Sequence, residues 1–163
     1  MYREIKWFSM TSYGVDPCSE SLPMFQMLAS QVDFIEKRLI SNLSGQVITL
    51  VCENISNFYI RDIILVNQFN EEGCDQIKTD VERGVNAIFS QHVLDESKLE
   101  SYIQLKDVIS LLNLKQANAL LLMESLGDAK QAKNHKEILA EIGLNSLDSD
   151  QALKILRRRV DMK

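Results

Sequence analysis

The strongest constraint on this chain is a helix-period spacing of apolar residues that few residues interrupt. Only two prolines and six glycines occur among its 163 residues. From residue 21 onward, apolar side chains recur every three or four positions, which places them on one face of an α-helix. Leu, Ile, Glu, Lys and Gln are common, and they favour helices over strands. The sequence therefore predicts an all-α fold, a bundle of about six to seven antiparallel helices.

The chain has the length of one domain, which we divide into an arm and a bundle. Residues 1–20 show no period, and we interpret them as an N-terminal arm, held in place if Trp7 fits a pocket. Residues 21–163 are expected to fold as a single helical-bundle domain. The first predicted helix starts near Ser21 and ends at Asn42 to Gly45. Four further helices are expected at about 46–67, 71–91, 98–113 and 117–126. Two short helices are expected after Asn134 and after Asp148 or Ser149.

Three local features refine these helices. Pro23 is expected in the first turn of the first helix, where its missing N–H does no harm. Gly84 lies inside a predicted helix, and close approach of a neighbouring helix would explain it. Asn134 and Glu137 have the spacing of a capping box, and Gly143 is expected to end the helix that they begin.

Charge and cysteine content narrow the class of protein. The net charge is −5 with a pI near 5.1, which argues against the broad basic surface of a nucleic-acid binder. Three cysteines without short spacings fit reduced thiols, not a disulfide framework. The most apolar stretch contains Glu53, Arg61 and Asp62, which argues against a lipid-spanning helix. No secretory signal is visible, so we expect a soluble, cytoplasmic chain.

Residues 66–85 surround a glycine with acidic side chains, which invites a comparison with a calcium loop. Placing Gly73 at the obligatory sixth position puts Gln68 first and Thr79 twelfth, where such a loop needs Asp and a bidentate Glu. The pattern therefore fits a helix start better than a calcium loop. Asn70 is expected to accept the first free N–H groups of that helix, beside acids that favour its positive end.

Residues for catalysis or metal binding are poorly supplied. The cysteines and histidines, namely Cys18, Cys52, Cys74, His92 and His135, show neither C-x-x-C nor H-x₃-H spacing. Cys74 and His92 lie about five turns apart on one predicted helix, so they cannot form a nucleophile and base there. G-x-S-x-G and P-loop patterns are absent. We predict no catalytic, cofactor-binding or metal-binding residues and no enzyme activity; a small helical enzyme or metal binder is the less favoured alternative.

Arg157, Arg158 and Arg159 form a short basic run in an acidic chain. Such a run can contact anionic lipid, phosphate or an acidic partner. It is also typical of a helix C-terminus, where positive charge is favourable, and we favour this reading.

Several stretches resemble one family. They are YREIKWFSM at 2–10, ILVNQFNEEGCDQIKTDV at 64–81, VISLLNLKQANALLLMESL at 108–126 and EIGLNSLDSDQALKILRRRV at 141–160. In order and spacing they resemble the C-terminal region of the RINT/TIP family, subunits of the Dsl-type tethering complex, called NRZ in animals. The most specific elements are the set Phe69, Gly73, Gln76 and Asp80 and the later Leu112–Leu114.

The resemblance implies a fold and a role. The fold is the C-terminal helical module of a rod-shaped tether of the CATCHR class, and the chain would be a fragment of a longer protein. The role is non-enzymatic: protein interaction in Golgi-to-ER retrograde vesicle transport, peripheral at the endoplasmic reticulum membrane. Implied partners are ER SNAREs, a third tether subunit and, mainly through an absent N-terminal part, a Zeste-white-ten-type subunit. The alternative is a checkpoint scaffold that binds Rad-fifty, a DNA-repair subunit. Neither role implies a cofactor or nucleic acid.

The family motif has a structural reading. Phe69 is expected to pack into the core, and Gly73 to permit the close approach of a helix. Gln76 and Asp80 lie one turn apart and are expected to hydrogen-bond a neighbouring segment. A role of these four residues in partner binding is the second reading.

Overall fold

The computed structural model describes residues 2–92, 99–128 and 134–162. Within these ranges the regular elements are helices, and the only strand-like contact is an isolated bridge between Phe69 and Arg159. The all-α prediction is therefore confirmed for the described residues. Among them, no helix combines the length and apolar character that crossing a bilayer requires.

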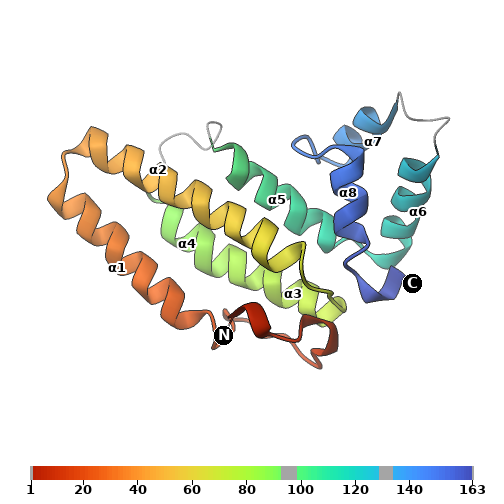
Figure 1. The fold of residues 1–163 in the computed structure, drawn as a ribbon, viewed down its shortest axis with the longest axis horizontal. Helices are drawn as coiled ribbons and strands as arrows, with labels where there is room; N and C mark the ends of the chain where they lie inside the picture. The colour runs from red at the N-terminus through yellow and green to blue at the C-terminus, as the bar shows by residue number, and fades with distance from the viewer. Residues whose placement is uncertain (1, 93–98, 129–133, 163) are drawn as a thin grey trace.

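The long helices run side by side and the short ones gather at one end (Figure 1). Helices α1, α2, α3 with α4, and α5 lie along the long axis, and α6, α7 and α8 form the end that holds the C-terminus. The N-terminal arm, drawn in red, lies against α3. The helices are α1 (Leu22–Arg38), α2 (Ser41–Phe58), α3 (Glu71–Asp80), α4 (Asn86–Phe89), α5 (Glu100–Leu112), α6 (Gln116–Gly127), α7 (His135–Glu141) and α8 (Ser149–Leu156).

The break between α1 and α2 lies earlier than the sequence predicted. Pro23 stands in the first turn of α1, as expected. Leu39 and Ile40 are both extended, with ψ of 152° and 146°, and the chain reverses there. The predicted stop at Asn42–Gly45 is therefore wrong, and Gly45 lies inside α2. Open space surrounds Gly45, so no packing contact makes a break necessary there.

Two helices continue through π-helical segments. Tyr59–Ile64 extends α2, and Val81–Val85 joins α3 to α4, so the predicted spans 46–67 and 71–91 are each one continuous rod. A Cβ on Gly84 would lie 2.1 Å from the Cζ of Phe25 in α1. The expected close approach at Gly84 is therefore confirmed.

The remaining helices agree with the sequence except in one cap. Helices α5 and α6 match the predictions for 98–113 and 117–126, although residue 98 lies outside the described residues. The predicted capping box at Asn134 is wrong, because its side chain makes no cap hydrogen bond. The helix start predicted at Asp148 or Ser149 is confirmed at Asp148, which forms a capping box, and its carboxylate accepts the Gln151 N–H at 2.7 Å. Gly143 ends the α7 turn with a φ of 81°.

One apolar core joins the arm to the bundle. Trp7 is fully buried, so the pocket expected for it exists, and Cys52 and Cys74 are buried as expected of small apolar side chains. The five largest fully buried side chains are aromatic, and they are Trp7 of the arm, Tyr59 of the π-helical continuation of α2, Phe69 just before α3, Phe89 of α4 and Tyr102 of α5.

Candidate functional site

The N-terminus of α3 holds the arm by direct hydrogen bonds. Asn70 caps the helix, since its Oδ1 accepts the Gly73 N–H at 3.0 Å. Its Nδ2 donates to the Met10 carbonyl at 2.6 Å. The predicted helix start is confirmed, and the capping side chain also binds the arm.

Gly73 is required by the arm. A Cβ at this position would lie 2.1 Å from the Trp7 carbonyl oxygen, which belongs to rigid backbone. The close approach at Gly73 is therefore that of the arm and not of a helix, which corrects one detail of the prediction. Phe69 is fully buried, with its ring centroid 5.6 Å from that of Trp7.

Gln76 and Asp80 form a buried polar network with the arm. Gln76 accepts the Gly14 N–H at 2.7 Å and donates to the Asp80 carboxylate at 2.9 Å. Asp80 also accepts the Cys18 N–H and the Tyr2 hydroxyl, each at 2.7 Å. Both side chains thus hydrogen-bond a neighbouring segment, and that segment is residues 2–18.

Burial dominates the electrostatics of this network. Burial raises the pKa of the Cys18 thiol to about 12, with smaller effects from Ser21 and Asp80. Burial raises the pKa of Tyr2 well above its ordinary value, and Tyr59 and Asp80 add to the effect. At the other end of α3, burial raises the pKa of Cys74 to about 12. These thiols stay protonated near neutral pH and are poor nucleophiles.

The raised pKa values predict a loss of stability in alkali. The unfolded thiols ionise near pH 9, whereas the folded thiols of Cys18 and Cys74 retain their protons until about pH 12. Their contribution is therefore complete below about pH 9 and lost as pH rises toward about 12, because the unfolded state then binds fewer protons. We expect the urea midpoint to fall between about pH 8 and pH 10.5, and less steeply in Cys74→Ala. A midpoint that rises or stays constant would contradict this.

The C-terminal turn closes on the same region from the other side. Phe69 N donates to the Arg158 carbonyl at 2.8 Å, and Val160 N donates to the Phe69 carbonyl at 2.9 Å. This two-bond bridge fixes the backbone between Arg158 and Val160. It turns the Arg159 side chain inward, where it is 4% exposed.

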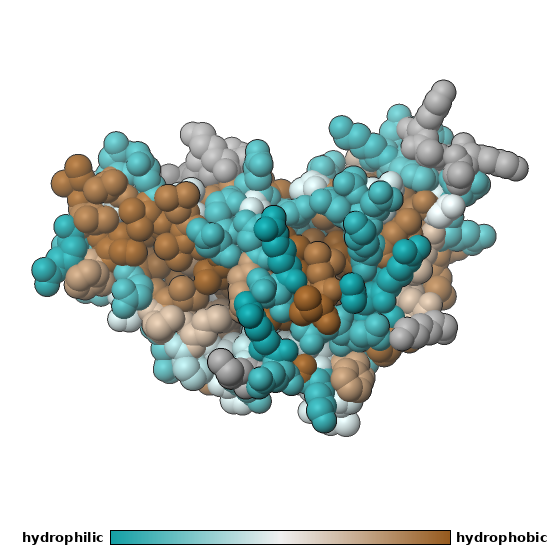
Figure 2. Space-filling model, viewed as in Figure 1, coloured by the Kyte–Doolittle hydropathy of each residue, from teal (hydrophilic) through white to brown (hydrophobic). Residues whose placement is uncertain are grey.

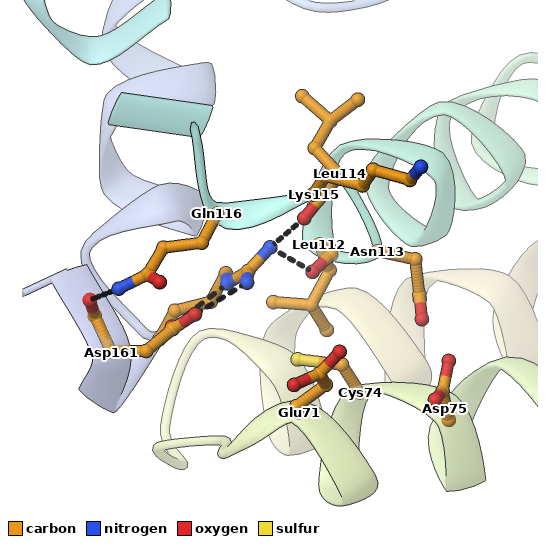
Figure 3. Close-up of a pocket in the computed structure, with 10 residues that line it drawn as sticks. Glu71, Cys74, Asp75, Leu112, Asn113, Leu114, Lys115, Gln116 and Asp161 are labelled. Carbon is orange, nitrogen blue, oxygen red and sulfur yellow. Dashed lines mark hydrogen bonds and ion pairs between the residues drawn. The ribbon is translucent and has the colours of Figure 1, made fainter. Parts of the chain in front are cut away.

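Arg159 joins the C-terminal turn to the end of α5 (Figure 3). Its guanidinium donates to the Leu112 carbonyl at 3.1 Å, to the Leu114 carbonyl, and to Asp161 at 2.6 and 3.0 Å. Burial lowers the pKa of Arg159, but the hydrogen bonds and charge of Asp161 outweigh it and raise the pKa overall. Of the three arginines predicted as partner contacts, Arg157 is exposed and Arg158 partly buried, so Arg159 is withdrawn from the surface.

The pocket beside Arg159 is small. It has a volume of about 100 Å³, and Glu71, Cys74 and Asp75 of α3 face Leu112–Gln116 across it. This volume is well below the roughly 300 Å³ at which small-molecule sites begin. Within the described residues, no group of three or more His, Cys, Asp or Glu side chains is placed to hold a metal ion. The geometry supports a rigid joint here.

Sequence reasoning missed the partners of these side chains. It named Gln76, Asp80 and Arg159 but not Tyr2, Cys18 or Asp161. Tyr2 and Cys18 lie in an arm without a period, so no spacing linked them to α3. The Asp161 carboxylate two residues after Arg159 was the available signal for an internal ion pair.

Comparison with known proteins relates nearly all of the chain to one protein family. The model of the RINT-1/TIP-1 family matches residues 1–159. A RINT1-like protein of Drosophila melanogaster is 29% identical over 140 residues, which are 86% of this chain and 19% of that protein. A chain in the crystal structure of the SNARE Sec20 bound to the Dsl1 complex subunit Tip20 matches with a TM-score of 0.70 and 20% identity. The match covers 96% of this chain and 28% of that one, and it agrees with the predicted all-α fold.

Proposed function

Because the chain belongs to the RINT-1/TIP-1 family, we propose that it is a non-enzymatic protein-interaction module of a vesicle-tethering complex subunit. The observation that carries the proposal is the family match over residues 1–159, which includes the arm, the α3 motif and the C-terminal turn. The chain spans only about a fifth of its fly relative, so the activity of the whole protein enters here as a proposal.

Binding of a SNARE is the central activity that we propose for this module. The solved neighbour was crystallised with the SNARE Sec20. A module that presents helical faces suits a helical partner domain. The arm and the C-terminal turn are held by buried hydrogen bonds, which supports a stiff unit that binds without large rearrangement.

The same proposal also covers the transport step, the membrane and the other subunits of the complex. The module would act in Golgi-to-ER retrograde transport, peripheral at the endoplasmic reticulum membrane. The third subunit of the tethering complex would bind this chain or a neighbouring part of the same protein. A Zeste-white-ten-type subunit would bind mainly elsewhere in the protein. The four motif residues Phe69, Gly73, Gln76 and Asp80 would serve as framework, since all are buried against the arm or core.

Titration calorimetry tests the proposal directly. The purified chain is titrated with the N-terminal domain of the ER SNARE that corresponds to Sec20, and separately with the third tether subunit. We expect saturable SNARE binding with a Kd near 1 μM, about −8 kcal/mol. The N-terminal domain of a plasma-membrane SNARE is the matched control and is expected to give no heat.

Absence of binding would contradict the proposal. A folded, monomeric chain that binds neither the SNARE domain nor the third subunit would remove the tethering role from this module. Binding of a Rad-fifty fragment in the same assay would then favour the checkpoint scaffold.

A further inference from the structure

A groove crosses the face of the bundle between the end of α2, α5 and α8. It has a volume of about 250 Å³. Apolar side chains from these elements and from the loop before α8 form its floor, and they are Ile60, Leu65, Val108, Leu147 and Ile155. Figure 2 shows hydrophobic surface near the centre of this face, with hydrophilic side chains around it.

The rim of the groove carries two cations without acidic partners. Arg61 of the π-helical segment and Lys154 of α8 both line the groove, and both are exposed. Neither forms an ion pair with any of the described residues. In a chain of net charge −5, two unpaired cations beside an apolar floor form a local site for negative charge.

Local backbone geometry sets one wall of the groove. Ile60 and Arg61 lie in the π-helical segment Tyr59–Ile64. Such segments are rare and occur frequently at functional sites. Here the segment contributes one floor residue and one rim cation, so the same distortion supplies both kinds of contact.

The groove continues into a second hollow, which makes it elongated. That hollow has a volume of about 520 Å³ and shares Asn57, Arg61 and Gln104 with the first. Its far end contains Glu100 and Ser101, so the positive charge is confined to the Arg61 and Lys154 end. An elongated groove with an apolar floor fits a helix that lays down one face, as helix-in-groove partners do.

We propose that this groove binds an amphipathic helical segment of a partner protein, with apolar side chains on the floor and carboxylates paired to Arg61 and Lys154. The inference rests on the proposed function, because it names the chemistry by which a SNARE or tether subunit is recognised. The acidic side chains lie along the edge of the helix that faces Arg61 and Lys154. Specificity comes from the sign of the charges and from the spacing of the apolar anchors.

Peptide binding to the intact chain tests the groove. The probe is a labelled peptide of about 16 residues, long enough to form a helix, with leucines at spacings of three and four and glutamates along one edge of the apolar face. Fluorescence anisotropy is expected to show saturable binding at least about tenfold tighter than that of the same peptide with lysines for glutamates. Equal binding of the two peptides would overturn the proposal.

Variants of residues that line the groove, with one control outside it, locate the binding. Arg61→Glu and Lys154→Glu are each expected to weaken binding of the acidic peptide about tenfold or more, a loss of about 1.4 kcal/mol. Gln104→Trp, which fills the groove without changing charge, is expected to weaken it as well. Lys6→Glu makes the same charge change on the exposed part of the arm and is expected to leave binding unchanged. Equal losses in Lys6→Glu and Arg61→Glu would reject the groove in favour of nonspecific attraction.

The same variants separate this inference from the proposed function. If the SNARE domain binds wild type and Arg61→Glu equally, the groove proposal fails while the proposed function stands. If the acidic peptide binds in the groove but no SNARE domain or tether subunit does, the groove chemistry stands and the proposed function fails.

Discussion

Replacing Asp80 with alanine is expected to lower the free energy of unfolding by about 3 kcal/mol, because buried donors lose a charged acceptor. Asp80 is fully buried and accepts hydrogen bonds from Tyr2, Cys18 and Gln76. The Tyr2 hydroxyl and the Cys18 N–H both lose this acceptor, so the arm loses two of its hydrogen bonds to α3. Urea unfolding followed by circular dichroism measures the change.

A neighbour on the same helix provides the control for Asp80. Asp75→Ala removes an aspartate that is only partly buried, and its carboxylate makes no hydrogen bond with the described residues. We expect a change within about 0.5 kcal/mol for that variant. Faster proteolysis in residues 1–20 should accompany Asp80→Ala alone. Equal stability of the two variants would show that the network does not hold the arm.

Arg159→Ala is the second large change that we expect, also about 3 kcal/mol, because it removes a buried guanidinium that pairs with a partly buried carboxylate and donates to two carbonyl groups. Asp161 would lose the guanidinium, and the Leu112 and Leu114 carbonyls would lose their shared donor. The loss disconnects the C-terminal turn from the end of α5. Thermal or urea unfolding of the variant gives the magnitude.

Arg157, two residues earlier in the chain, provides a control that matches Arg159 in charge. Arg157→Ala removes the same positive charge from an exposed side chain. Its effect on unfolding should stay within about 0.5 kcal/mol. If Arg157→Ala and Arg159→Ala destabilise equally, the basic run acts through general charge and not through the buried contact at Arg159.

The helices were predictable where one apolar face met one core. The spacing in α1 up to Val32, in α5 and in α8 follows the period of a helix packed on one side. Asn70 was found as a cap because its side chain acts on the next turn of its own helix. Gly84 was interpreted correctly because a glycine inside a helix signals close packing.

Other features depend on contacts between distant segments. The apolar spacing of three and four residues continues past Val32 to Leu39 and Leu43, yet the helix breaks at Leu39 and Ile40, and Ile40 is 77% exposed. The bonds of Asp80 to Tyr2 and Cys18 join residues 62 or more positions apart. The sequence did not distinguish Arg159 from its two neighbouring arginines, whereas the bridge to Phe69 turns Arg159 inward. No local pattern encodes these pairings.

The role of the motif residues and of Arg157 and Arg158 in partner binding stays a prediction. The buried positions of Phe69, Gln76 and Asp80 favour the structural reading. The division into an arm of residues 1–20 and a bundle of 21–163 also stays a proposal. Proteolysis of wild type and Asp80→Ala, as above, addresses it.

The central claim is that this chain binds a SNARE through the groove between the end of α2, α5 and α8. Methyl NMR spectra recorded while a SNARE domain is titrated into the chain test this claim most directly. We predict saturable shift changes at the methyl groups of Ile60, Val108 and Leu147, which line the groove, and unchanged signals from Val32 of α1. Spectra that stay unchanged at a saturating excess of the SNARE domain would contradict the claim.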